Sequence, residues 1–167
     1  DNQGKNVSYG VTPTDKQFYT VLPVRSNGSD KCLYLLSTDA RIPSEHPVYT
    51  KLNLFNVCGN PSSKDVKINN VKDIEISSAP IPVSALQPST ERRIDTGDGR
   101  MQTAVSQDGI IVNAFNTACV PAGDVNQACV RVQMINTSDY SLSEDASVGI
   151  KGHDMFHPSL AVNNKGE

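Results

Sequence analysis

The fold is decided by the stretch Arg100-Met-Gln-Thr-Ala-Val-Ser-Gln-Asp-Gly-Ile-Ile-Val-Asn-Ala-Phe115. Apolar and β-branched residues stand on both sides of Gln107-Asp-Gly109, and Asp-Gly between two such runs is a strong signal for a tight hairpin turn. The stretch therefore predicts a strand, an Asp-Gly turn and a second strand. Ala128-Cys-Val-Arg-Val-Gln-Met-Ile135 then alternates apolar and polar residues, which is the period of a half-buried strand. A fourth, weaker strand is expected between Ser141 and Ile150.

Runs with the same alternation recur in the first half of the chain. Val48 to Val57 is the clearest of them, and Val66 to Ile76 alternates on either side of Asn69-Asn70. Ala79 to Pro88 contains three prolines, which lack the amide donors of a central strand, so it is expected to be a linker or an edge segment. Two shorter strands are expected at Phe18 to Val24 and at Cys32 to Leu36. No segment shows a helical period with a cap, and the predicted fold class is therefore all-β.

The composition limits the class of protein. The 167 residues suffice for one ordinary domain, and 37% of them are hydrophobic, which is less than in most globular chains. A thin core with many loops fits this composition. The 15 basic and 18 acidic residues are interspersed without a basic stripe, so no nucleic-acid partner is expected. No run reaches the roughly 18–20 apolar residues of a membrane span.

Four cysteines point to an oxidising compartment. Cys32, Cys58, Cys119 and Cys129 are well separated, and none belongs to a Cys-x-x-Cys pair, the spacing typical of zinc and redox sites. Disulfides are therefore predicted, and with them a secreted, extracellular or periplasmic location. We expect the pairs Cys32–Cys58 and Cys119–Cys129, because the first pair lies on two β-rich runs and the second flanks a loop rich in turn residues.

Three Asn-x-Ser/Thr triplets are candidates for N-glycosylation in a host that glycosylates exported proteins. They begin at Asn6, Asn27 and Asn136. The competing interpretation is that the three triplets arose by chance, because the chain is rich in Asn and Ser. The sequence opens on Asp1 without a signal segment, and this residue is expected to be either a mature end left by signal cleavage or the cut end of a longer sequence.

A short repeat links two distant parts of the chain. Thr103-Ala-Val-Ser-Gln-Asp-Gly109 and Leu160-Ala-Val-Asn-Asn-Lys-Gly166 share an Ala-Val pair, polar turn residues and a closing Gly, at an offset of 57 residues. Four strands are expected between the copies, which is the content of one propeller blade, whose repeats are about 40–50 residues long. The second copy stops at Glu167 before its second strand, so the remainder of a propeller is expected from the same chain or from another.

From Arg92 onward the chain resembles the broad sialidase-like, BNR-type group of β-propellers, in which an inner strand is followed by a polar turn containing Gly. Ser106-Gln-Asp-Gly109 is similar to the Ser-x-Asp-x-Gly-x-x-Trp turn of that group, although Asp and Gly lie one residue closer together and the chain has no Trp. The resemblance implies antiparallel four-stranded blades of an incomplete β-propeller and no catalytic residues; a β-sandwich is the alternative. The predicted division is a flexible lead-in (1–15), a first blade-like unit (16–90), a second blade (91–152) and the start of a third (153–167).

The densest group of charges is Arg92-Arg-Ile-Asp-Thr-Gly-Asp-Gly-Arg100. Asp95 and Asp98 could supply part of the oxygen shell of a calcium ion, the one cofactor that the sequence points to, although the order of residues in an EF-hand is absent. Arg100 could instead bind the carboxylate of an anionic ligand through two hydrogen bonds, with Asp95 and Asp98 beside it. The simplest interpretation is an Asp/Gly turn with Arg–Asp pairing.

A second group lies in Gly152-His-Asp-Met-Phe-His157-Pro. His153, Asp154 and His157 are residue types that bind transition metals. The flanking glycine and proline argue against the helix that would bring both histidines to one face, so a loop between units is the competing interpretation.

The function hypotheses start from an absence of motifs. The sequence contains no phosphate-binding loop, Gly-x-Ser-x-Gly elbow or His-Glu-x-x-His motif. We therefore expect an exported extracellular or cell-surface scaffold or binding module of the propeller type, with a glycan, a surface protein or its own kind as partner. The second hypothesis is a carbohydrate-active hydrolase, a sialidase-like glycosidase that uses Arg100, Asp95, Asp98 and Asp108. The third is a structural adhesin sandwich, and the sequence leaves enzyme activity undecided.

Overall fold

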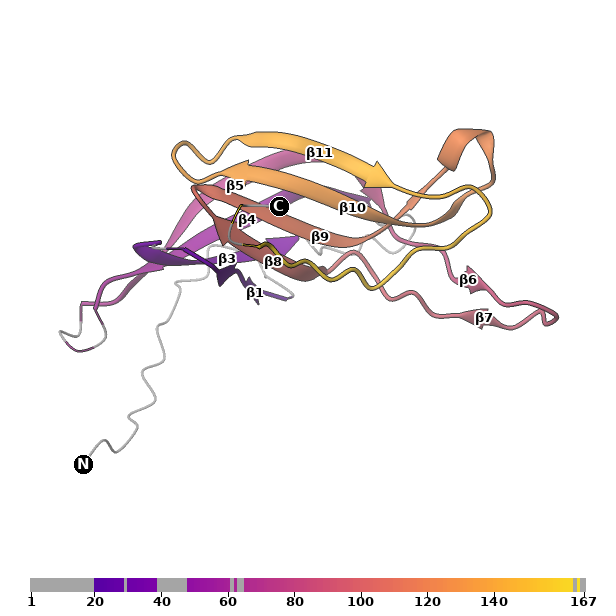
Figure 1. The fold of residues 1–167 in the computed structure, drawn as a ribbon, viewed down its shortest axis with the longest axis horizontal. Helices are drawn as coiled ribbons and strands as arrows, with labels where there is room; N and C mark the ends of the chain where they lie inside the picture. Colours follow the sequence, from indigo (N-terminus) through magenta and orange to yellow (C-terminus); the bar gives the residue numbers. More distant parts are fainter. Residues whose placement is uncertain are drawn as a thin grey trace, which may run out of the picture.

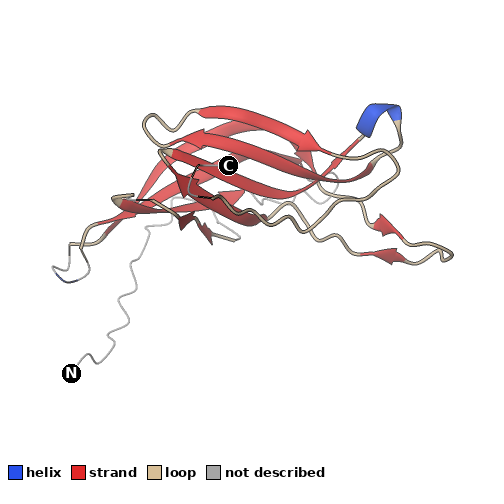
Figure 2. Cartoon of the chain, viewed as in Figure 1, coloured by secondary structure: helices blue, strands red, loops and turns tan. Residues whose placement is uncertain are grey.

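The protein is built from β-strands, which confirms the predicted fold class (Figure 2). The computed structural model describes residues 20–28, 30–38, 48–60, 62, 65–163 and 165. The strands are β1 (Leu22–Pro23), β2 (Arg25–Ser26), β3 (Cys32–Thr38), β4 (Val48–Cys58), β5 (Lys67–Pro80), β6 (Ala85–Leu86), β7 (Arg93–Ile94), β8 (Met101–Gln107), β9 (Ile110–Cys119), β10 (Gln127–Asn136) and β11 (Leu142–Val148). One short 3-10 turn, η2 (Pro121–Gly123), lies between β9 and β10.

The first sheet is an antiparallel meander in the order β1-β3-β4-β5. Leu36, Leu54 and Ile74 of its strands are buried, and on β4 the whole run Leu52–Phe55 is buried rather than alternate residues alone. Cys32 on β3 and Cys58 on β4 are direct partners in the ladder and form a disulfide. The first predicted disulfide is therefore confirmed.

The second sheet is an antiparallel meander of β8, β9, β10 and β11, and β2 joins it in parallel beside β8 (Figure 1). Asp108 and Gly109 form the tip of the β8–β9 turn with positive φ angles of 51° and 81°, the conformation that Asp-Gly favours. Cys119 at the end of β9 is bonded to Cys129 on β10, which confirms the second predicted disulfide. The strand–turn–strand prediction is confirmed as well.

The two sheets stack face to face and share one core (Figure 1). Leu36 and Ile74 of the first sheet belong to the same buried cluster as Ile111 and Phe115 of β9. Tyr49 of β4 meets Phe115 edge to face, with ring centroids 6.5 Å apart. Removal of apolar side chains of both sheets from water, at about 25 cal/mol per Å², is the main force that holds the sheets together.

A buried ion pair lies on the inward side of the second sheet. Arg131 Nε of β10 is 2.6 Å from Asp145 Oδ1 of β11, and the two side chains are only 9% and 10% exposed. Gln133 Nε2 donates to the same carboxylate oxygen, and the backbone N–H of Ser77 on β5 donates to the other at 2.8 Å. Burial raises the pKa of Asp145, but these hydrogen bonds and the Arg131 charge outweigh it and hold the pKa below its ordinary value. Asp145 therefore fastens β11 to the first sheet.

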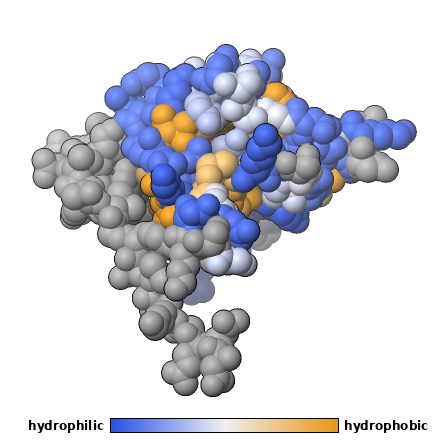
Figure 3. All heavy atoms as spheres, turned by 90° about the vertical axis from the view of Figure 1, so that its left-hand side faces the viewer, coloured by the Kyte–Doolittle hydropathy of each residue, from blue (hydrophilic) through white to orange (hydrophobic). Residues whose placement is uncertain are grey.

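The β8–β9 and β10–β11 turns lie at one end of the stacked sheets, which we call the turn end (left in Figure 1). Figure 3 views the molecule from this side, and the surface in view is mostly hydrophilic, with apolar atoms in small groups. The β8–β9 turn is capped by Thr137, whose hydroxyl and backbone N–H both donate to the carbonyl of Gly109 at 3.0 and 2.8 Å. The β8–β9 and β10–β11 turns are thus bonded to each other.

Two segments refine the sequence-based expectation. β5 runs unbroken through Asn69-Asn70, because β4 pairs with both asparagines and a register shift between Leu54 and Phe55 absorbs the irregularity. The stretch Ala79 to Pro88, expected to be a linker or an edge segment, contains the end of β5, which is an edge strand, and the short strand β6. Its prolines fit this placement, since Pro80 ends an edge strand, where the missing donor is tolerated.

One strand pairs across the predicted boundary between the first two units. β2 lies within the predicted first unit (16–90) but pairs with β8 of the second unit (91–152). The second sheet thus takes its edge strand from a distant part of the chain, which alternation cannot reveal. The described residues form two stacked sheets and no closed ring of blades. The predicted lead-in (1–15), the first residues of the Phe18 to Val24 strand and the last residues of the third unit lie outside the described residues.

Candidate functional site

The predicted ligand-binding residues lie at the end of the sheets opposite the turns, which we call the loop end: residues 81–100, 120–126 and 149–158 (right in Figure 1). In an antiparallel meander, alternate connections fall at the same end, so the β9–β10 loop, the exit of β11 and the entry to β8 meet there. Four large hydrophobic side chains are more than half exposed among the described residues, and all belong to this end: Leu86, Val120, Val125 and Ile150. Polar loops that display apolar side chains are typical of interaction surfaces.

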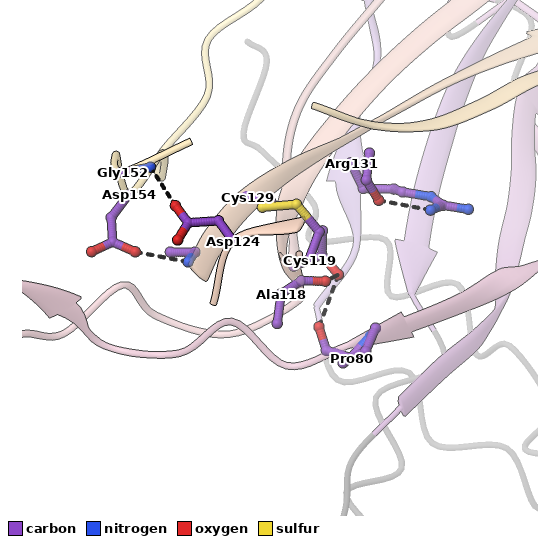
Figure 4. The surroundings of a disulfide bond; sticks show 11 residues. Pro80, Ala118, Cys119, Asp124, Cys129, Arg131, Gly152 and Asp154 are labelled. Carbon is purple, nitrogen blue, oxygen red and sulfur yellow. Dashed lines mark hydrogen bonds between the residues drawn. A yellow bond between two sulfur atoms is a disulfide. The ribbon is translucent and has the colours of Figure 1, made fainter. Parts of the chain in front are cut away.

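Two aspartates tie these loops together. Asp154 accepts the backbone N–H groups of Leu86 at 2.8 Å and Ala128 at 2.9 Å, and so joins the 81–100 segment to β10. Asp124 accepts the N–H of Gly152 at 2.7 Å (Figure 4). The N–H of the residue after Asp124, and then that of Gly152, lower the pKa of this carboxyl. The two carboxyl groups therefore hold all three loop segments in one arrangement.

The Cys119–Cys129 disulfide closes the base of the 120–126 loop (Figure 4). Its sulfur atoms pack against Gly149, where a Cβ atom would lie only 2.7 and 2.8 Å from the two Sγ atoms. Glycine is needed at this position because no larger residue lets the chain pass so close to the bridge. The disulfide thus also positions the start of the 149–158 segment.

The predicted ligand residues form a compact loop before β8. Asp95 accepts the N–H of Gly97 at 2.9 Å, and Asp98 Oδ1 accepts the N–H of Arg100 at 3.0 Å and its Nε–H at 2.8 Å. These contacts match the turn with Arg–Asp pairing, the simplest of the three interpretations. The Arg100 side chain is 46% exposed at the loop end, although its Nε–H is bonded to Asp98. A cation in that position can meet an anionic group of a ligand.

Gly99 connects this loop to the core. Its backbone N–H donates to the Tyr49 hydroxyl at 3.2 Å, and a Cβ atom at Gly99 would lie 2.0 Å from Tyr49 Cε2. Burial raises the pKa of the Tyr49 phenol, while the hydrogen bond from Gly99 acts in the opposite direction. The position of the predicted ligand loop therefore depends on a core aromatic ring.

Gly99→Ala should lower the free energy of unfolding by about 1–3 kcal/mol, the usual cost of overpacking, because the ring must move away. Urea unfolding followed by circular dichroism measures the loss. Gly28→Ala is a matched control, since no heavy atom lies within 4 Å of a Cβ at that position. Equal stability of Gly99→Ala and wild type would contradict the close contact with Tyr49.

A buried asparagine organises the same region, and the sequence analysis missed it. Asn116 of β9 is fully buried; its Nδ2 donates to the carbonyl of Thr96 at 2.7 Å, and its Oδ1 accepts the N–H of His157 at 2.8 Å. The His157 ring lies against Gln102, with Nδ1 and Oε1 3.2 Å apart. One amide thus joins the ligand loop, β9 and the 149–158 segment. The only signal in the sequence was a polar residue inside an apolar strand.

The predicted transition-metal group does not form. His153 Nδ1 lies 3.0 Å from the carbonyl of Lys151, while Asp154 and His157 make the separate contacts given above. No three His, Cys, Asp or Glu side chains gather into a metal-binding cluster in the part of the chain that is described. The interpretation of this segment as a loop between units is the better one. Calcium binding by the 95–100 loop stays a prediction.

Asp108, the other residue of the hydrolase hypothesis, lies at the turn end. The length of β8 separates it from Arg100 by about 25 Å, at roughly 3.3 Å per residue. The two residues therefore cannot serve one catalytic centre of this chain, and the hydrolase hypothesis loses one of its carboxylates.

The glycosylation candidates have different surroundings. Asn27 Nδ2 donates to the carbonyl of Val162 at 3.1 Å, and Asn136 Oδ1 accepts the N–H of Ser138 at 2.9 Å. Asn6 lies outside the described residues. Glycosylation at all three positions stays a prediction.

Comparisons with protein-family models, with curated proteins and with solved structures found no match. None of the described residues forms a helix that is long and apolar enough to cross a membrane.

Proposed function

We propose that this chain is an exported, non-catalytic scaffold of the β-propeller type that binds a ligand at its loop end. Export is supported by the two disulfides, since such bonds form and persist in oxidising compartments. The propeller type is supported by two successive four-stranded antiparallel meanders, each with the strand content of a blade. A non-catalytic role is supported by the carboxylates of the loop end: Asp95, Asp98, Asp124 and Asp154 all accept backbone N–H groups.

Three copies of one short motif, Val-x-x-x-Gly, carry this proposal. In each copy a Gly follows a Val by four residues: Val24-Arg-Ser-Asn-Gly28, Val105-Ser-Gln-Asp-Gly109 and Val162-Asn-Asn-Lys-Gly166. Arg25 of the first copy pairs in parallel with Val105 of the second. Leu160 donates its backbone N–H to Thr103 Oγ1 at 3.2 Å. Each of these two residues stands two positions before the Val of its copy, Leu160 in the third and Thr103 in the second. The motif copies are therefore neighbours in space as well as similar in sequence.

The first and third copies are also bonded to each other. Arg25 Nη2 donates to the carbonyl of Leu160 at 2.9 Å, and Asn27 Nδ2 donates to that of Val162 at 3.1 Å. On this proposal the three copies lie near one another because the blades of a propeller are arranged around a central channel. On this proposal the segment around Leu160 begins a third unit, and the remainder of the propeller comes from the same chain or from another.

The ligand that we propose is a glycan that carries a carboxylate. Arg100 supports this choice, because its side chain is 46% exposed among the loops of the loop end and a guanidinium can bind a carboxylate by charge-assisted hydrogen bonds. The exposed apolar side chains nearby fit the non-polar face of a sugar or a protein surface that carries the glycan.

A glycan array that includes neutral, sialylated and uronic-acid glycans tests this function. Binding should be confined to the acidic glycans, and Arg100→Ala should weaken it by about tenfold or more, which is the scale of one charge-assisted contact. Arg100→Lys should retain part of the affinity, since the charge remains. Lys67→Ala, an exposed cation at the start of β5, is the matched control and should bind normally. Absence of acidic-glycan binding, or equal binding by Arg100→Ala, would show the proposal to be wrong.

A structural adhesin sandwich is the second candidate, and one observation favours it. The two sheets share a single buried cluster, as the sheets of a sandwich do. The candidates differ in what lies on the other side of the second sheet. A sandwich leaves that side to solvent, whereas a blade has a neighbouring sheet on each side.

A further inference from the structure

The β6–β7 hairpin projects from the loop end, away from the two stacked sheets (Figure 1). Within the described part of the chain its two strands pair only with each other, through the residue pairs Ala85–Ile94 and Leu86–Arg93. Every residue from 88 to 95 is exposed. A two-stranded hairpin with so little pairing is marginally stable by itself, so this segment opens locally at a small cost in free energy.

Two adjacent arginines lie on the exposed segment. The Arg92 side chain makes no hydrogen bond or ion pair with any described residue, and Arg93 makes one contact, from Nη1 to the carbonyl of Ser84 at 3.3 Å. Endoproteases that cleave after arginine recognise such a side chain through a carboxylate in the specificity pocket. Proteolytic cuts concentrate at exposed loop tips of this kind.

The backbone of Arg93 faces the open side of the hairpin. Opposite residues of an antiparallel pair alternate between exchanging two hydrogen bonds and pointing their N–H and C=O groups outward. Leu86 donates its N–H to Asp154 Oδ2 at 2.8 Å, so Leu86 and Arg93 are not the hydrogen-bonded pair. The N–H and the carbonyl of Arg93 therefore point to an edge that no other described strand covers. An extended peptide can bind a partner through such an edge, as an added strand.

The hairpin also lies at the division between the two sheets. The first disulfide ends at Cys58 and the second begins at Cys119, so neither crosses the Arg93–Ile94 bond. Three contacts do cross it: β2 pairs with β8, Asp145 accepts the N–H of Ser77, and both sheets share one buried cluster. A cut after Arg93 would break the chain and leave the packing between the sheets in place.

We propose that the Arg93–Ile94 bond is a processing site for an endoprotease specific for paired arginines. Hydrolysis consumes one water molecule and leaves a carboxylate on Arg93 and an ammonium group on Ile94. The products are residues 1–93 and 94–167, which stay folded together without a covalent link. This inference goes beyond ligand binding and does not depend on the nature of the ligand.

Limited proteolysis of the full chain tests the inference, with trypsin and with a subtilisin-like endoprotease specific for paired basic residues. Both should cut the Arg93–Ile94 bond about tenfold or more faster than any other lysyl or arginyl bond of the described residues, because the rate follows the population of the locally open state. Mass spectrometry of the products identifies the bond.

Two variants separate the roles of the arginines. Arg93→Gln should slow cleavage of this bond by about 100-fold or more with both enzymes, because the carboxylate of the specificity pocket loses its partner. Arg92→Gln should slow it by about tenfold or more with the paired-basic enzyme alone, which is the scale of one charge-assisted contact. Lys151→Gln is the matched control, since Lys151 is also exposed at the loop end, and it should be cut like wild type.

The state of the cut protein provides the second measurement. It should elute as one species from a size-exclusion column under native conditions and should separate into two fragments in urea without a reductant. Faster cleavage of another described bond, no cleavage of the hairpin, or an unchanged rate for Arg93→Gln would overturn the inference. Separation of the fragments under native conditions would overturn it as well.

Discussion

Asp145→Ala should lower the free energy of unfolding by about 3–5 kcal/mol, because it leaves the Arg131 guanidinium buried without its partner. Desolvation of an unpaired charge is the larger part of this cost. The substitution also leaves the N–H of Ser77 without its acceptor and removes a link between the two sheets. Urea unfolding at neutral pH, followed by circular dichroism, measures the loss.

Two comparisons make this prediction specific. Glu75→Ala removes the partner of Lys51 in a pair whose side chains are 40% and 71% exposed, and should change stability by less than about 1 kcal/mol. Arg131→Met combined with Asp145→Leu should recover much of the loss, since no unpaired charge remains. A similar small loss for Asp145→Ala and Glu75→Ala would contradict the buried ion pair.

The stabilising effect of Asp145 should depend on pH in a defined direction. The folded state lowers the pKa of this carboxyl below its ordinary value of 3.8. The contribution is therefore fully present above the unfolded pKa and is lost as the pH falls from there through the lower folded pKa. The difference in unfolding free energy between wild type and Asp145→Asn should shrink below about pH 4.

Loss of the disulfides should have effects of similar size. Cys32→Ser with Cys58→Ser should cost about 3.5 kcal/mol on the chain-entropy relation, because the bond closes a separation of 26 residues. Cys119→Ser with Cys129→Ser should cost about 2.7 kcal/mol, because that separation is 10 residues. Each bond restricts the unfolded chain, and the longer loop loses more freedom.

Thermal unfolding of the two double variants, compared with reduced and oxidised wild type, measures these effects. Reduced wild type should be less stable than either double variant. The Cys119–Cys129 variant should also weaken glycan binding, since the bridge fixes the 120–126 loop and packs against Gly149. Equal stability of oxidised and reduced protein would contradict the expectation for both bonds.

The features that the sequence predicted correctly are local or periodic. Alternation located β4, β5 and β10, since it records which side of a strand is buried, and apolar runs beside turn residues located β3, β8 and β9. The Asp108-Gly109 pair located a turn because it favours positive φ angles. The disulfides followed from their strands, because Cys32 and Cys58 are direct ladder partners and Cys119 and Cys129 flank a short loop.

The features that the sequence did not predict depend on distant contacts. The parallel pairing of β2 with β8 joins residues about 80 positions apart, and no local pattern encodes it. The contacts that organise the loop end also join residues far apart in the sequence. The Asp95 to Arg100 turn was visible in the sequence, whereas the amide of Asn116, which joins that turn to His157, depends on tertiary structure. The spacing of the histidines left a metal site and a loop as alternatives, because it says nothing about where a loop directs its side chains; in the described residues they join no metal-binding cluster.

The central claim of this account is that the three copies of the Val-x-x-x-Gly motif lie side by side, and nuclear Overhauser contacts test it most directly. The account predicts contacts between the amide proton of Leu160 and the side chain of Thr103, and between the backbones of Arg25 and Val105. Absence of these contacts in a folded protein, with the amide of Leu160 exchanging freely with water, would contradict it.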